Sequence, residues 1–272
     1  MNPISKSTTV IATLAASVAL VACGGDGESG KSTGADEAPA STTETAATPS
    51  TEVSASLPQG SEPADLDPSE FTTEIDNPYL PFAVGSRWVY SETADGEPDQ
   101  KVVVEVTGKT KMIANGVEAL VVRDTVTEGG DLVELTDDWY AQDSGGNVWY
   151  LGEDTAEYED GKRVSRRGSF EAGVDGAEAG VVMPADPQVG MEYRQEYYEG
   201  EAEDRAEVLS LEEKAEVPTG YYPKTLMTKD LVPLEPKVSE HKFYAEGVGL
   251  VLALAHSGGE GREELVSFTP GK

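Results

Sequence analysis

The chain has 272 residues and carries 51 Asp and Glu against 20 Lys and Arg, a formal net charge of −31. This balance excludes nucleic acid as a partner, because phosphate binding needs clustered cations, and it disfavours adsorption to anionic lipid headgroups. Cys23 is the single cysteine, so the chain has no internal disulfide and depends on its hydrophobic core for stability.

The first 22 residues have the layout of a secretory signal. Lys6 precedes an apolar run over residues 10–22, which is shorter than the ~20 apolar residues of a membrane-spanning helix. The run ends in Leu20-Val21-Ala22-Cys23, which resembles the lipobox of bacterial lipoproteins at every position. An ordinary cleaved signal followed by a coincidental cysteine is the alternative.

The lipoprotein resemblance implies that the Cys23 thiol receives a diacylglyceryl group and that the chain is cut just before it. Residues 1–22 are then a signal peptide, and Cys23 is the membrane anchor, because two acyl chains such as palmitate are enough for stable attachment. The resemblance also implies a location on the outer face of the cytoplasmic membrane, or on the outer membrane of a cell with two membranes.

Residues 23–70 are expected to form a disordered tether. They are rich in Ser, Thr, Ala, Glu and Pro and contain no aromatic residue. Such a segment buries too little apolar surface to offset the entropy of ordering it. A coil of this length spans about 35–40 Å on average, which separates a folded domain from the lipid surface.

Residues 71–272 are predicted to form one all-β domain. Alternating segments rich in Val, Thr, Trp and Tyr, with turns such as Asn115-Gly116 between them, predict an antiparallel meander of about ten strands. So many strands curl into a half-barrel, close into a barrel, or pack as a sandwich. Residues 168–187 are expected to be an irregular connection beside any ligand opening. The expected strands are 87–92, 101–107, 117–126, 132–142, 148–151, 165–171, 191–199, 205–217, 223–230, 238–246, 248–256 and 263–268.

The domain resembles a family of exported bacterial proteins without an assigned activity. The resemblance is carried by residues 75–81, by 138–143 together with 146–150, and by 244–249. It supplies no catalytic or binding residue to transfer. A fainter architectural similarity links the domain to LolA-like lipoproteins, in which a curved half-barrel sheet holds an acyl chain.

A non-catalytic role in ligand binding or envelope scaffolding is the leading hypothesis, with a monomeric chain and no cofactor. A curved sheet offers a concave face that suits a small apolar ligand. Trp88, Tyr90, Trp149 and Tyr150 are the candidate lining residues, together with the apolar strand at 248–255.

Two other function classes stay open, although no serine-hydrolase elbow, zinc motif or phosphate-binding loop is present. Asp138 and Glu153 lie near the aromatic hairpin, and paired carboxyls could hydrolyse a glycan of the envelope. Asp143 and Asn147 offer oxygen ligands for Ca²⁺, although a tight turn also favours Asp, Gly and Asn. Whether the protein is an enzyme is left uncertain, with a non-enzymatic role favoured.

Overall fold

A computed structural model describes residues 57–94, 99–257 and 260–272, which are almost entirely β-structure. The predicted signal peptide, Cys23 and most of the predicted tether lie outside these residues. No helix in the described part of the chain is long and apolar enough to cross a membrane. The prediction of an all-β, antiparallel domain is confirmed.

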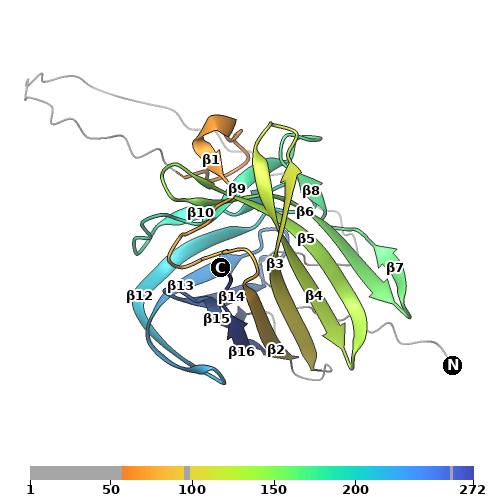
Figure 1. Cartoon of the computed structure of the whole chain (residues 1–272), viewed down its shortest axis with the longest axis vertical. Helices are drawn as coiled ribbons and strands as arrows, with labels where there is room; N and C mark the ends of the chain where they lie inside the picture. Colours follow the sequence, from red (N-terminus) through yellow and green to blue (C-terminus); the bar gives the residue numbers. More distant parts are fainter. Residues whose placement is uncertain (1–56, 95–98, 258–259) are drawn as a thin grey trace, which may run out of the picture. The chain divides into compact units, whose positions relative to one another are not determined.

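The described elements are one 3-10 helix and sixteen strands (Figure 1). They are η1 (Pro68–Glu70), β1 (Phe71–Thr72), β2 (Arg87–Ala94), β3 (Gln100–Met112), β4 (Glu118–Glu128), β5 (Asp131–Asp143), β6 (Val148–Glu159), β7 (Lys162–Ser165), β8 (Phe170–Glu171), β9 (Glu178–Met183), β10 (Glu192–Arg194), β11 (Glu196–Tyr197), β12 (Arg205–Val217), β13 (Gly220–Leu231), β14 (Ser239–Ala245), β15 (Gly249–Ser257) and β16 (Gly261–Thr269).

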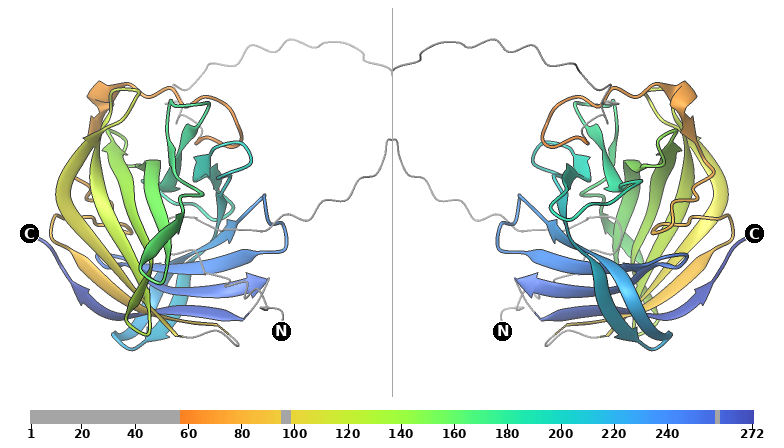
Figure 2. Two further views of the ribbon diagram at one scale, coloured as in Figure 1. Left: turned by 90° about the vertical axis from the view of Figure 1, so that its right-hand side faces the viewer. Right: turned by 90° about the vertical axis from the view of Figure 1, so that its left-hand side faces the viewer.

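These strands form one sheet that curls almost into a closed barrel. Its order is β10-β12-β13-β14-β15-β16-β2-β3-β4-β5-β6-β9-β11, and β1, β7 and β8 pair beside this path. The first and last strands, β10 and β11, are separated by Gln195 alone, so residues 192–197 connect both ends of the sheet. Figure 2 shows β3–β6 as one wall and β13–β16 crossing below it. Of the three predicted architectures, the barrel is therefore the closest to the observed sheet.

Alternation along the strands divides the apolar side chains between two clusters. On β4, Leu120 and Val122 belong to the large cluster inside the barrel, whereas Ala119 and Val121 belong to a smaller cluster on the outer face. Phe71 packs against the outer cluster. Because successive side chains of a strand point to opposite faces of the sheet, a run of consecutive apolar residues contributes to both clusters.

The seam at residues 192–197 is held by Arg194 and by a close main-chain approach. Arg194 is 1% exposed, and its Nη2 donates to Ala179 O at 2.6 Å. Its Nη1 donates to the carbonyl oxygens of Gly60 and Glu62, the latter at 2.7 Å. A Cβ added to Gly180 would lie 2.2 Å from Gln195 main-chain atoms, so this position requires glycine.

The N-terminal boundary of the packed domain precedes Phe71. Arg194 N donates to Pro58 O at 2.7 Å, and Leu57 packs against the main core. Ala64 N donates to the Glu178 carboxylate at 3.0 Å. Residues 57–70, which the sequence assigned to the tether, are therefore part of the folded domain, because hydrogen bonds and apolar contacts order them.

Two predicted segments require correction. A single strand over 165–171 is wrong: β7 ends at Ser165 and β8 begins at Phe170, because Gly168 adopts φ +90° within a turn. The irregular connection expected over 168–187 contains β9, which pairs with β6 and β11. The remaining predicted strands coincide with observed ones to within about five residues at their ends, with two exceptions. The strand predicted over 148–151 continues to Glu159 in β6, and the one predicted over 191–199 is divided between β10 and β11.

Candidate functional site

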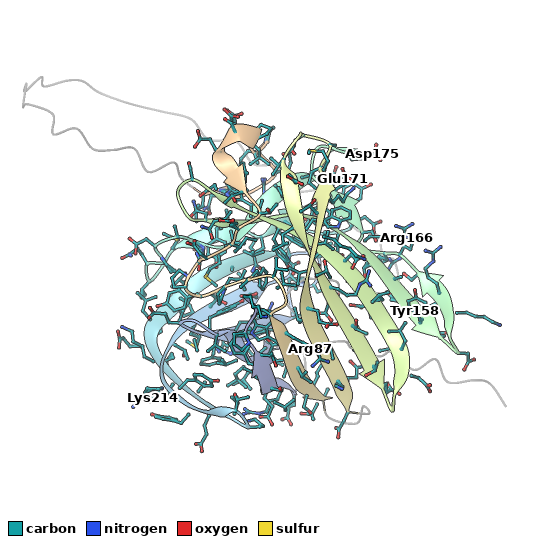
Figure 3. All side chains as sticks on the ribbon, viewed as in Figure 1. Arg87, Tyr158, Arg166, Glu171, Asp175 and Lys214 are labelled. Carbon is teal, nitrogen blue, oxygen red and sulfur yellow. The ribbon has the colours of Figure 1, made fainter. Side chains whose placement is uncertain are left out.

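A pocket of about 380 Å³ lies where β6 and β8 meet the segment that follows β8. Figure 3 shows Arg166, Glu171 and Asp175, three of its lining residues, on one side of the molecule. The pocket therefore lies beside the 168–187 connection, where a ligand opening was expected. Its complete lining is Lys111, Trp139, Glu153, Asp154, Arg166, Ser169, Phe170, Glu171, Val174, Asp175, Ala177 and Tyr198.

The basic side chains of the pocket are engaged by its own acids. Lys111 Nζ lies 2.8 Å from the Glu171 carboxylate and 4.4 Å from the centroid of the Trp139 ring. Arg166 forms an ion pair with Asp154. These contacts hold the aromatic and acidic walls in place. The lining has four acidic side chains and two basic ones.

Glu153 belongs both to the pocket and to a buried hydrogen-bonded trio. The Tyr150 hydroxyl lies 2.8 Å from Asp138 Oδ1 and 2.8 Å from Glu153 Oε2. One hydroxyl donates one hydrogen, so the second short contact needs a carboxyl that donates its own proton. Burial raises the pKa of Asp138 to about 8, which agrees with a protonated carboxyl at neutral pH.

Asp138 and Glu153 are also part of a larger array, which we name the carboxyl belt. Its members are nine buried acidic side chains of the described residues, and cross-strand register places several of them side by side. Glu263 faces Glu92, and Asp138 faces Glu153. The belt consists of Glu92, Asp124, Asp138, Glu153, Glu196, Asp204, Asp230, Glu240 and Glu263.

One side of the belt contains a buried cation. Lys242 Nζ lies 2.9 Å from Asp230 Oδ2 and 3.9 Å from Glu240 Oε2, with every side chain at most 10% exposed. Burial lowers the pKa of Lys242, but the neighbouring acidic groups, of which Asp230 contributes most, together outweigh burial and raise the pKa above its ordinary value. Lys242 is therefore charged at neutral pH in the folded domain.

Other members of the belt have carboxyl oxygens without such a partner. Both carboxyl oxygens of Glu196, both of Glu263 and Oδ1 of Asp124 have no hydrogen-bond partner among the described residues. Burial raises the pKa of all three carboxyls well above the ordinary value, and neighbouring acids add to the shift. Unpartnered buried acids of this kind are costly in the ionised form.

The predicted apolar lining residues occupy different places. Trp88 donates from Nε1 to Val248 O at 2.7 Å, and Tyr90 donates to Leu250 O at 3.0 Å, so both contact the 248–255 segment. They lie in the main core with Tyr150. Trp149 packs against Phe71 at the outer cluster, with ring centroids 6.1 Å apart. None of these four predicted residues lines the 380 Å³ pocket.

Asp143 and Asn147, the candidate Ca²⁺ ligands, stabilise the turn between β5 and β6. Asp143 Oδ1 accepts from Asn147 N at 2.9 Å, and Asp143 Oδ2 accepts from Trp149 Nε1 at 2.8 Å. Asn147 Oδ1 accepts from Ala185 N at 2.9 Å. Within the described ranges, no group of three or more His, Cys, Asp or Glu side chains could hold a metal ion.

Several members of the belt were not predicted as functional residues. Glu92 and Glu263 occur at the inward positions of strands whose other inward residues include Tyr90 and Leu265. A charged residue in phase with buried apolar ones is the sequence signal that identifies them. Glu196 gives no such signal, because it lies in a segment of only two paired residues.

Comparison with known proteins gives one distant structural match. It is a crystal structure of a candidate lipoprotein from Parabacteroides distasonis ATCC 8503, with 11% sequence identity and a TM-score of 0.39. The match covers 70% of this chain and 98% of that chain. At this TM-score it assigns neither a fold nor a function. No protein-family model and no curated protein matches the chain, so the family resemblances stay predictions.

Proposed function

We propose that the protein is a lipid-anchored protein of the cell envelope whose β domain binds a small polar molecule without transforming it. The observation that carries this proposal is the pocket of about 380 Å³ whose wall includes Glu153, a member of the buried carboxyl belt. The pocket has the size of a ligand site, and its lining is more polar than that of most such sites. We infer that the ligand is polar because seven of the twelve lining residues, namely six charged residues and Ser169, have polar side chains.

Native mass spectrometry of the full chain, purified in detergent from the cells that produce it, tests ligand binding. Val174 lines the pocket and is 39% exposed, so Val174→Trp fills the opening without disturbing the core. Val164→Trp is the matched control, because Val164 is 52% exposed and lies outside the pocket. We expect a retained small molecule on the wild type and on Val164→Trp, and its loss from Val174→Trp. A chain that retains nothing in any form would favour scaffolding.

The anchor is proposed from Leu20-Val21-Ala22-Cys23 and is tested separately. Metabolic labelling with palmitate should mark the wild-type chain, and Cys23→Ser should abolish the label because the acyl group has no thiol to modify. The same label on both chains would refute the anchor and leave the ligand-binding proposal intact.

Glycan hydrolysis by Asp138 and Glu153 is the second candidate function, because Tyr150 joins the two carboxyls. Burial of Asp138 argues against it, since a glycan would have to reach both carboxyls. Asp138 is 2% exposed and does not line the pocket, whereas Glu153 does. A hydrolase needs both carboxyls at the scissile bond. Glycan screening of the wild type, Asp138→Asn and Glu153→Gln decides the question, since activity lost in both variants would establish catalysis.

A further inference from the structure

The pocket of about 380 Å³ lies where the edge of the sheet beside β6 is divided among three short strands. β6 pairs with β9 at residues 148–150, with β8 at 152–153 and with β7 at 157–159. Of the lining residues, Trp139 belongs to the outer apolar cluster, whereas Phe170 and Ala177 belong to the main core. Both clusters therefore supply apolar wall to the same pocket.

Main-chain contacts fix the wall that β8 contributes. A Cβ added to Gly152 on β6 would lie 2.3 Å from Phe170 O, so only glycine lets β8 approach β6 this closely. The Ser169 hydroxyl accepts from Thr155 N at 3.0 Å and donates to Thr155 O at 3.2 Å. The wall is therefore formed before any ligand arrives, and binding does not have to order it.

Two ion pairs in the lining favour a ligand without net charge. The side chains of the Lys111–Glu171 and Arg166–Asp154 pairs are between 24% and 53% exposed, so a ligand can reach them. Each pair presents a positive and a negative group side by side, and a charged ligand group is repelled by one where the other attracts it. A hydroxyl group both donates and accepts, so it can bond to either member without displacing its partner.

The other lining residues disfavour an organic cation and an anion. Lys111 Nζ lies 4.4 Å from the centroid of the Trp139 ring, so the aromatic face that would attract an organic cation already holds a cation of the chain. Glu153 and Asp175 bring the lining to four acidic side chains against two basic ones, which disfavours an anion. Both carboxyls can accept hydrogen bonds from hydroxyl groups.

We propose that the pocket binds a neutral saccharide of one or two pyranose rings. The hydroxyl groups of the sugar bond to the two ion pairs, and its C–H faces pack against Phe170 and Val174, which line the same pocket. A volume of about 380 Å³ is near the small end of ligand sites, which limits the ligand to this size. This inference rests on the proposed ligand-binding function and names its ligand class.

Calorimetric titration of the full chain at pH 6, in a detergent without a sugar headgroup, tests the proposal with maltose, cellobiose and N,N′-diacetylchitobiose. We expect at least one of these neutral disaccharides to bind, with binding abolished by Val174→Trp and retained by Val164→Trp. Arg166→Met should weaken binding about 10-fold, because it removes a charged hydrogen-bond donor. Arg163→Met removes the same charge from an exposed residue outside the pocket and should leave the affinity unchanged.

The charge of the ligand provides a second readout. Chitobiose without its acetyl groups has the same rings and is cationic at pH 6, so it should bind more weakly than the acetylated form. Raising NaCl from about 20 to about 500 mM should change the affinity for a neutral disaccharide less than about twofold, because salt screens net charges.

Three outcomes would overturn the saccharide proposal. They are no binding of any of the three neutral disaccharides, binding that survives Val174→Trp, and binding of the cationic chitobiose as tight as that of a neutral disaccharide. If native mass spectrometry still detects a retained molecule that Val174→Trp removes, the ligand-binding proposal survives and the ligand class is wrong.

Discussion

On β13 and β14, Asp230 and Glu240 lie beside Lys242, whereas on β4 and β16, Asp124 and Glu263 have oxygens without any hydrogen-bond partner among the described residues. The first group is neutralised by the chain itself. In the second group burial raises the pKa of both carboxyls, which favours their protonated form. The difference shows that one barrel interior contains an ion-paired network and a second set of acids whose charge depends on pH.

Removal of Lys242 tests the first group, in which this cation neutralises Asp230 and Glu240, and should have the largest effect on stability. Lys242→Met leaves Asp230 and Glu240 buried without their cation, so the free energy of unfolding should fall by about 3–5 kcal/mol in urea denaturation. Lys224→Met is the control, since the Lys224–Glu212 pair is 58% and 74% exposed, and no measurable change is expected. Equal effects of the two substitutions would show that Lys242 is not essential to the fold.

The pH dependence of stability tests the buried acids that lie away from Lys242. The pKa of Asp138 rises from 3.8 to about 8 on burial. At pH values between the unfolded and the folded pKa, the folded chain holds a proton that the unfolded chain releases. The free energy of unfolding is therefore greatest at the low end of this range and falls as the pH rises. Thermal unfolding should show a Tm about 5–10 °C lower at pH 8 than at pH 5. A Tm that rises over this interval would contradict the assignment.

Tyr140 and Tyr150, whose rings stack on each other, allow a test with a smaller expected effect in which each variant is the control for the other. Tyr150→Phe removes the hydroxyl shared by Asp138 and Glu153, which should cost about 1–3 kcal/mol of unfolding free energy. Tyr140→Phe removes a hydroxyl that has no partner in the described chain, and its effect should stay within about 0.5 kcal/mol. Chemical denaturation of both variants measures the difference, and a costlier Tyr140→Phe would reverse our description of the trio.

Most strands were predictable because alternation is a local property of the sequence. The strands from β2 to β6 show it clearly, and their turns contain residues such as Gly116 and Gly146 at positive φ. β9 was missed because its central Gly180 and neighbouring Ala179 reduce its strand propensity, while the requirement for glycine comes from Gln195 in a distant segment.

The candidate site was less predictable than the fold. Asp138 and Glu153 were named from their proximity to aromatic residues, and the structure joins them through Tyr150. Glu196 and Glu263 enter the belt through strand order and register, which depend on contacts between residues far apart in the sequence. No local pattern contains that information.

The fastening of residues 57–62 to the seam has a mechanical consequence. Gln59 Nε2 donates to Glu192 O at 2.6 Å, and the Arg194 main chain and side chain hold Pro58 and Glu62. Any tension that reaches Leu57 along the chain is therefore transmitted to residues 192–194, at the place where β10 joins β12 through three residue pairs. Force applied at the N-terminal end of the described domain would therefore load the short β10–β12 pairing before the longer pairings elsewhere in the sheet.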